Sequence, residues 1–190
     1  MSDLQPETGR YLLDKSASRF TVRAFATGML SAMGHNPTIA IRDFSGEVTF
    51  DPGLAEKPSL RIQIRADSLE VIDDIKSKDR KEMESMMNQK VLESTKYPVI
   101  TFDSTTMSAK QIGEGRFQVD LNGSLLLHGV TGGVPVPVQV ILLGDTMRAS
   151  GDFSLLQSNY GIAPVSVAGG ALKLKDELKF TFDIVARKQE

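Results

Sequence analysis

The two histidines, His35 and His128, are the side chains in this sequence best suited to acid–base or metal chemistry. They are distant from each other in the sequence, and neither has a second ligand at a metal-binding spacing. His128 stands beside Gly129 at the end of an extended run, a position typical of a hydrogen-bonded structural histidine. His35 lies in an apolar loop, where it could contact the polar head of a ligand. We predict neither a metal site nor a cofactor.

Other catalytic arrangements do not occur in the sequence. It contains no cysteine, which excludes a thiol nucleophile, a thiolate metal site and a disulfide. The glycines at 113–115 and 132–133 precede strand-like runs and not helices, so they do not form a phosphate-binding loop. We therefore predict that the protein is not an enzyme. An enzyme that uses His35 or His128 is the alternative.

Methionines gather in two segments. Met29 and Met33 lie in the loop 27–37, which is more apolar than a solvated loop requires. Met83, Met86 and Met87 follow the spacing of one helix face. Because methionine adapts to irregular shapes, each segment could either cover the end of a core or form an entrance for an apolar ligand.

Most of the chain alternates between apolar and polar residues, which is typical of β-strands. We therefore expect strands to position the histidines and methionines described above. About eight such runs, joined by hairpin-type turns, predict an antiparallel barrel or sandwich. Pro135 and Pro137 remove two N–H donors from one side of their strand, so we expect an edge or a break in the pairing there. The runs cover residues 19–26, 38–50, 60–66, 99–104, 116–131, 134–142, 147–155 and 178–186.

The segment 73–96 differs, because its apolar residues have a helical period. Asp73 is the expected N-cap, and Pro98 returns the chain to a strand. Six acidic and six basic residues cover the other face of this helix. That balance argues against docking on an anionic membrane, which requires an excess of lysine and arginine.

Length and charge limit the remaining possibilities. The 190 residues fit one domain, 10–190, after a loose segment 1–9. The net charge of −2, without a basic arm, argues against a nucleic-acid partner. The sequence has no apolar run of ~18 residues to span a membrane. It also has no signal peptide, so we expect a soluble, cytoplasmic protein, or a periplasmic one if a leader has been removed.

Several short strings, taken together, resemble the YceI-like family of polyisoprenoid-binding, lipocalin-like proteins. The most specific is segment 96–104, which is similar to the family's Y-P-x-I-x-F-x-S string. Segment 121–131 looks like its G-x-L-x-L-H-G-V-T string, and segment 44–52 looks like its F-x-G-x-(V/I)-x-F-D-P string. The remaining matches, in family order, are residues 11–14, 18–20, 67–69, 78–80 and 160–162.

The resemblance implies an all-β fold: an elongated, eight-stranded antiparallel lipocalin-like barrel with a helical insertion at about 73–93. It implies a long isoprenoid or related amphiphile inside the barrel, often in a dimer, and a periplasmic location for many members. Gln157 departs from the arginine that members often have before the Tyr-Gly-Ile turn, so the identity of the ligand is not carried over.

We therefore predict a non-catalytic carrier that binds an isoprenoid or acyl chain inside the barrel. The alternative is a structural or interaction domain with a filled barrel, which could form a homodimer through an edge strand such as the one containing Pro135 and Pro137. The predicted ligand contacts are Phe20, Val22, Met29, Met33, His35, Met83, Met86, Met87, Val119, Leu121, Phe153, Phe180 and Phe182.

Overall fold

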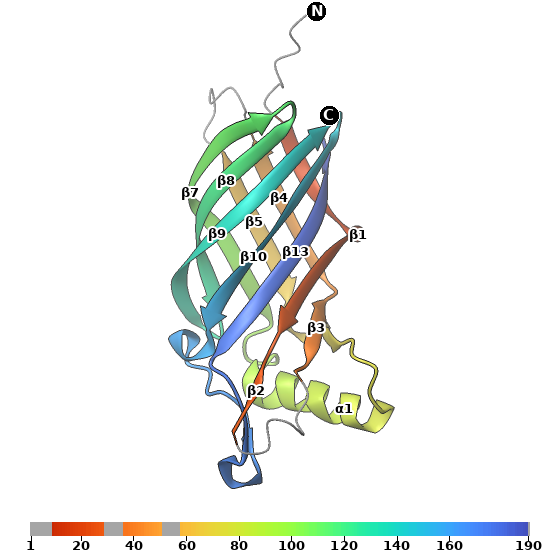
Figure 1. Cartoon of the computed structure of the whole chain (residues 1–190), viewed down its shortest axis with the longest axis vertical. Coiled ribbons are helices and arrows are strands. Elements are labelled where there is room, and N and C mark those ends of the chain that lie inside the picture. The colour runs from red at the N-terminus through yellow and green to blue at the C-terminus, as the bar shows by residue number, and fades with distance from the viewer. Residues whose placement is uncertain (1–8, 29–35, 51–57, 190) are drawn as a thin grey trace, which may run out of the picture.

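The protein forms an elongated barrel of eight antiparallel strands, in a computed structural model that describes residues 9–28, 36–50 and 58–189 (Figure 1). This confirms the fold class predicted from the sequence. The barrel strands are β1 (Gly9–Arg23), β4 (Phe44–Phe50), β5 (Ser59–Arg65), β7 (Val99–Gly113), β8 (Arg116–Leu127), β9 (Val130–Leu143), β10 (Thr146–Leu156) and β13 (Glu177–Lys188).

Strand β1 closes the barrel by pairing with both β4 and β13. Around the barrel the order is β1, β4, β5, β7, β8, β9, β10 and β13, so strands that follow one another in the chain mostly lie side by side. In the β1–β13 ladder Phe20 lies opposite Phe182, and the register shifts between Asp14 and Arg19. Closed pairing removes the exposed edges that an open sheet would leave.

The two prolines of β9 coincide with a gap in the pairing, as the sequence predicted. Residues 139–143 of β9 pair with β10, and the ladder stops before Pro137. On the other side β9 stays paired with β8, where Pro137 lies opposite Asp120 and Pro135 opposite Asn122. The missing N–H donors therefore shorten one ladder without opening the barrel.

Short elements surround the lower end of the barrel in Figure 1. Strands β3 (Thr38–Ile41) and β6 (Leu69–Val71) extend the main sheet next to β1. A separate small sheet consists of β2 (Ala26–Thr27), β11 (Ser166–Val167) and β12 (Leu172–Leu174). Three short 3₁₀ turns connect these elements: η2 (Ala66–Ser68), η4 (Gln157–Tyr160) and η5 (Ala168–Gly170).

Helix α1 (Ser77–Met86) lies across the lower end and continues into a π-helical turn, η3 (Met87–Val91) (Figure 1). Both lie within the predicted insertion, but the helix begins later than expected. Asp73 is not its N-cap, because the Asp73 carboxylate accepts a hydrogen bond from the Thr38 N–H at 2.7 Å. The N-cap position is Lys76, whose side chain makes no capping hydrogen bond.

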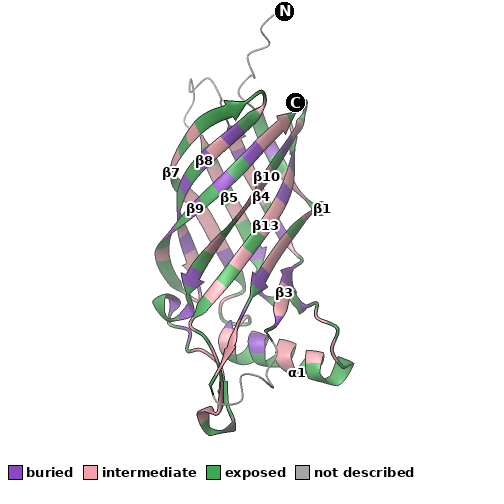
Figure 2. Ribbon diagram, in the orientation of Figure 1, coloured by how far each residue is buried: buried purple, intermediate pink, exposed green. Residues whose placement is uncertain are grey.

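Burial follows the predicted alternation most clearly on β8 and β9, where buried positions recur at every second residue over much of each strand (Figure 2). The buried residues of all eight barrel strands belong to one apolar cluster. Among the described residues, no helix has the length and apolar composition needed to cross a membrane.

Candidate ligand-binding site

The inward-facing side chains of the barrel enclose a cavity of about 520 Å³. Small-molecule sites commonly have volumes of about 300–1,000 Å³. Among the described residues, Gln157 and Lys173 are the only cavity-lining residues with polar side chains. The barrel is therefore hollow over part of its length, and its wall suits an apolar ligand.

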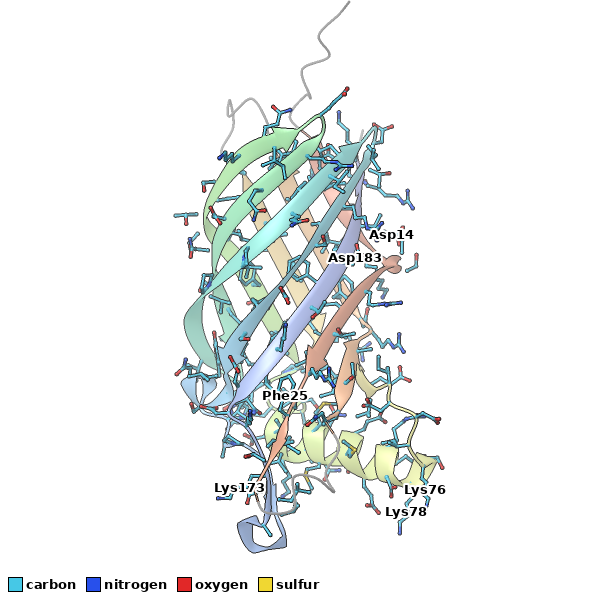
Figure 3. The ribbon with its side chains drawn as sticks, in the orientation of Figure 1. Asp14, Phe25, Lys76, Lys78, Lys173 and Asp183 are labelled. Carbon is cyan, nitrogen blue, oxygen red and sulfur yellow. The ribbon has the colours of Figure 1, made fainter. Side chains whose placement is uncertain are left out.

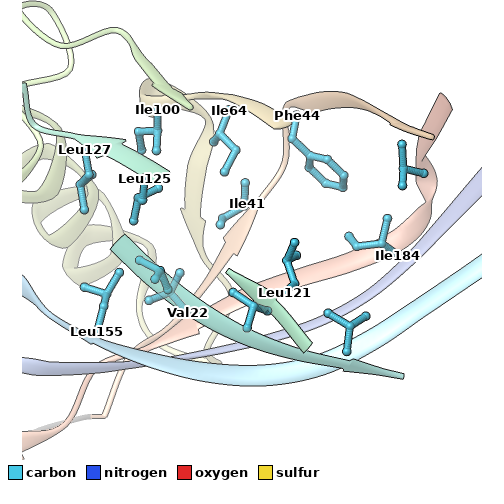
Figure 4. Close-up of a cluster of buried hydrophobic side chains, with 14 of the residues drawn as sticks. Val22, Ile41, Phe44, Ile64, Ile100, Leu121, Leu125, Leu127, Leu155 and Ile184 are labelled. Carbon is cyan, nitrogen blue, oxygen red and sulfur yellow. The ribbon is translucent and has the colours of Figure 1, made fainter. Parts of the chain in front are cut away.

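Regular alternation on β8 and β9 builds one side of this wall. Val134, Val136, Val138 and Val140 of β9 are buried, whereas Pro135, Pro137 and Gln139 between them are exposed. Figure 4 shows side chains from several strands, among them Val22, Ile64 and Leu125, pointing into the barrel. Because strand side chains alternate between the two faces, an apolar–polar repeat gives an apolar interior and a polar exterior.

All of the predicted ligand contacts that lie in the described residues line this cavity. Their contact with a ligand stays a prediction. Met29, Met33 and His35 lie outside the described residues. The residues placed on the wall are Phe20, Val22, Met83, Met86, Met87, Val119, Leu121, Phe153, Phe180 and Phe182.

The upper end of the barrel is packed with large side chains. The rings of Phe50 and Phe117 meet edge to face, with 5.3 Å between their centroids. Tyr11, Phe117 and Met147 are each only 3% exposed. Burial raises the pKa of the Tyr11 phenol, and the charge of Asp145 adds to this effect. These side chains fill the upper part of the barrel interior.

Four phenylalanines form an aromatic cluster on the cavity wall: Phe20, Phe153, Phe180 and Phe182. Phe153 stacks on Phe180 with 4.7 Å between ring centroids, and Phe20 packs against both Phe180 and Phe182. All four rings are only half-buried although they belong to inward-facing positions. They therefore offer apolar surface to a ligand, and such surface contributes about 25 cal/mol per Å² when it is covered.

Helix α1 and the π-helical turn η3 close part of the lower end. Met83, Met86, Met87 and Val91 line the cavity, and Met87 is 8% exposed. The charged side chains of the helix lie on its other faces, with Lys76 and Lys78 near its far end (Figure 3). A methionine-rich wall at the mouth can adapt to chains of different shape.

Two hydrogen bonds join α1 to residues that precede it in the chain. The Val71 N–H donates to Oε1 of Glu84 at 2.9 Å, which joins β6 to the middle of the helix. Nη2 of Arg80 donates to the backbone carbonyl of Asp73 at 2.8 Å. These polar contacts hold the helix to β6 and to the segment before it, while Met83 and Met86 line the cavity.

His128 connects the segment after the helix to the turn between β8 and β9. Its Nε2 lies 2.6 Å from Oε2 of Glu93, and its Nδ1 lies 3.3 Å from the carbonyl oxygen of Tyr160. Its ring packs against Tyr97, with 4.6 Å between centroids. The expectation of a hydrogen-bonded, structural histidine is confirmed, and His128 does not line the cavity.

Charged groups lie on the outside of the barrel, where they pair between neighbouring strands. Arg61 donates to Asp103 at 2.5 Å, and Arg148 donates to Asp183 at 2.7 Å. The Arg148 guanidinium lowers the pKa of Asp183, which is on the outer surface in Figure 3. No cluster of three or more His, Cys, Asp or Glu residues in the described ranges could hold a metal ion.

Sequence reasoning missed several residues of the wall. Ile62 and Phe102 line the cavity from β5 and β7, and the alternation of their strands was a sufficient signal to find them. Gln157 was noted only as a departure from a family pattern. Its burial depends on contacts with Lys175 and Asp176, for which the sequence contains no local signal.

A family model described as the YceI-like domain matches residues 11–186 of this chain. That match covers every barrel strand except the ends of β1 and β13. In a comparison with curated proteins, no match was found.

Three solved structures illustrate the likeness in fold. Burkholderia cenocepacia BcnA is 22% identical with a TM-score of 0.70, and the alignment covers 91% of this chain and 98% of that one. A polyisoprenoid-binding domain from Saccharophagus degradans, implicated in plant cell wall breakdown, is 15% identical with a TM-score of 0.67, covering 94% and 98%. The Campylobacter jejuni YceI protein is 16% identical with a TM-score of 0.62, covering 83% and 88%.

Proposed function

The chain belongs to the YceI-like family, and we propose that it is a non-catalytic carrier that holds the apolar chain of an isoprenoid or acyl lipid inside its barrel. The observation that carries this proposal is the hollow barrel, with an apolar-walled cavity of about 520 Å³. The description of the similar Saccharophagus degradans domain as polyisoprenoid-binding supports the lipid class of the ligand.

The composition of the wall favours binding without chemistry. Its polar groups within the described residues are the neutral carboxamide of Gln157 and the side chain of Lys173, which is exposed. Neither is arranged as a nucleophile with an adjacent base, which covalent catalysis requires. Each methylene that leaves water contributes about 0.8 kcal/mol, so a long tail supplies most of the affinity.

Native mass spectrometry of the purified protein, before and after extraction with organic solvent, tests the proposal. We expect a 1:1 complex with a lipid-like molecule that the solvent removes, and renewed 1:1 binding when farnesol or hexadecanol is added. A protein that always emerges empty and binds neither probe would contradict the carrier function.

A further inference from the structure

Gln157 is a buried polar residue on the wall of an apolar cavity. It is 3% exposed, and apart from the tyrosines no other described residue with a polar side chain is as deeply buried. Its backbone N–H donates to the Asp176 carbonyl at 3.0 Å, and its backbone carbonyl accepts from the Ile162 N–H at 3.2 Å. Both backbone polar groups of Gln157 are therefore hydrogen-bonded within the protein.

The orientation of the Gln157 carboxamide follows from its neighbours. Nε2 lies 3.0 Å from the Lys175 carbonyl oxygen and 3.4 Å from the Asp176 carbonyl oxygen. Two carbonyl oxygens can accept only from the NH₂ group, so the amide oxygen must point away from them. Both hydrogen bonds that the Gln157 side chain makes to described residues use Nε2, not Oε1.

Building on the proposed carrier function, we propose that Gln157 Oε1 is a specificity-determining acceptor for a ligand whose head group is a neutral hydrogen-bond donor, such as a primary alcohol or a carboxamide. A ligand hydroxyl or amide N–H can donate to this oxygen, and one net hydrogen bond strengthens binding by roughly 3- to 10-fold. The tail then occupies the apolar wall while the head reaches Oε1.

An anionic head group does not fit this position. A carboxylate or phosphate has no proton for Oε1 and would lose its hydration beside an oxygen atom. Lys173 is the one cationic residue on the described wall, and it is exposed on the small sheet below the barrel, with its Nζ near Gly170 (Figure 3). An ammonium head would likewise lose its hydration, with no acidic residue on the described wall to balance it.

Three probes with one tail and different heads test the proposal: farnesol, farnesyl methyl ether and farnesyl phosphate. Their affinities are measured by displacement of a fluorescent apolar probe from the wild-type protein. We expect farnesol to bind roughly 3- to 10-fold more tightly than the methyl ether, the effect of one net hydrogen bond. We expect farnesyl phosphate to bind more weakly than farnesol.

Two variants separate the amide oxygen from the structural role of Gln157. Gln157→Met removes both halves of the amide, whereas Gln157→Lys keeps a donor for the two backbone carbonyls and removes the acceptor. Thermal unfolding shows whether each variant folds. We expect the farnesol-to-ether ratio to fall to within about twofold in both, since no acceptor remains. In Gln157→Lys, the added positive charge should also favour farnesyl phosphate.

The outcomes distinguish this proposal from the carrier function on which it rests. Equal binding of farnesol and its methyl ether by the wild type would overturn the role of Oε1 and leave the carrier function intact. An unchanged ratio in a folded Gln157→Lys variant would do the same. Failure of the wild type to bind any of the three probes would overturn both.

Discussion

Glu93 and His128 are hydrogen-bonded to each other, and within the described ranges they are the only non-glycine residues with positive φ, at 45° and 52°. Such backbone conformations are unfavourable for residues with a Cβ and persist where surrounding contacts impose them. Here the contact joins the segment after the π-helical turn η3 to the turn between β8 and β9. It therefore anchors the methionine-bearing mouth of the barrel to its wall.

Replacing Glu93 tests this anchor. In Glu93→Ala the hydrogen bond to His128 is lost while the backbone strain remains, so we expect the free energy of unfolding to fall by about 1–3 kcal/mol. Urea denaturation measures that change. The control is Glu114→Ala in the β7–β8 hairpin, where we expect less than about 0.5 kcal/mol. Equal stability of the two variants would show that the Glu93–His128 contact contributes nothing.

Filling the cavity should remove ligand binding and leave the fold intact. Ala149 faces the cavity from β10, so Ala149→Trp places an indole in the space available to the ligand. Ser154→Trp, at an exposed position of the same strand, is the matched control. We expect at least about tenfold weaker binding for Ala149→Trp, because the indole excludes several methylene groups of the ligand from the cavity. Probe displacement measures this, and unchanged affinity would mean that the ligand binds elsewhere.

Gly123 makes room for a ring of the cavity wall. A Cβ at Gly123 would lie 2.0 Å from Cζ of Phe102, so Gly123→Ala must displace that ring. Because Phe102 lines the cavity, we expect lower thermal stability and an altered ligand affinity. Gly133→Ala is the control, because a Cβ there meets no atom within 4 Å. Identical melting temperatures and affinities for the two variants would contradict the close approach of Phe102 to Gly123.

Acid should weaken the turn that holds Gln157. The Ser158 hydroxyl and backbone N–H donate to the Asp176 carboxylate and lower the pKa of Asp176. Because the folded pKa is below the unfolded value of ~3.9, this carboxylate stabilises the fold above about pH 4. That contribution is lost as the pH falls through the lower, folded pKa.

Melting temperatures between about pH 6 and pH 2 measure the effect of Asp176. In Asp176→Asn we expect a smaller decrease of the melting temperature at the acid end than in the wild type, since the amide does not titrate. Asp120→Asn, on the exposed face of β8, serves as the control. A wild-type-like acid dependence in Asp176→Asn would show that Asp176 does not link stability to pH.

The barrel could be predicted from the sequence because alternation is a local signal that each strand carries by itself. Val119 and Leu121, for example, were assigned to the interior from their spacing alone, and both line the cavity. The break in pairing at Pro137 was also predictable, because a missing N–H donor acts wherever the strand is placed.

Features that depend on distant partners could not be predicted in this way. Asp73 resembles an N-cap in the sequence, but the Thr38 N–H, far away in the chain, binds its carboxylate. Gln157 resembles a surface residue, but the Lys175 and Asp176 carbonyls hold it in the wall. The volume of the cavity also depends on how side chains from eight strands meet, which periodicity does not specify.

A chain-length series tests the central claim, that the barrel binds an apolar tail, most directly. Straight-chain primary alcohols from decanol to octadecanol share one head group and differ only in methylenes, and probe displacement gives the affinity of each. We predict affinity that rises by up to about fourfold per added methylene until the cavity is full, and then levels off. Affinity that does not depend on chain length, or binding that does not saturate at one ligand per chain, would contradict a tail-binding barrel.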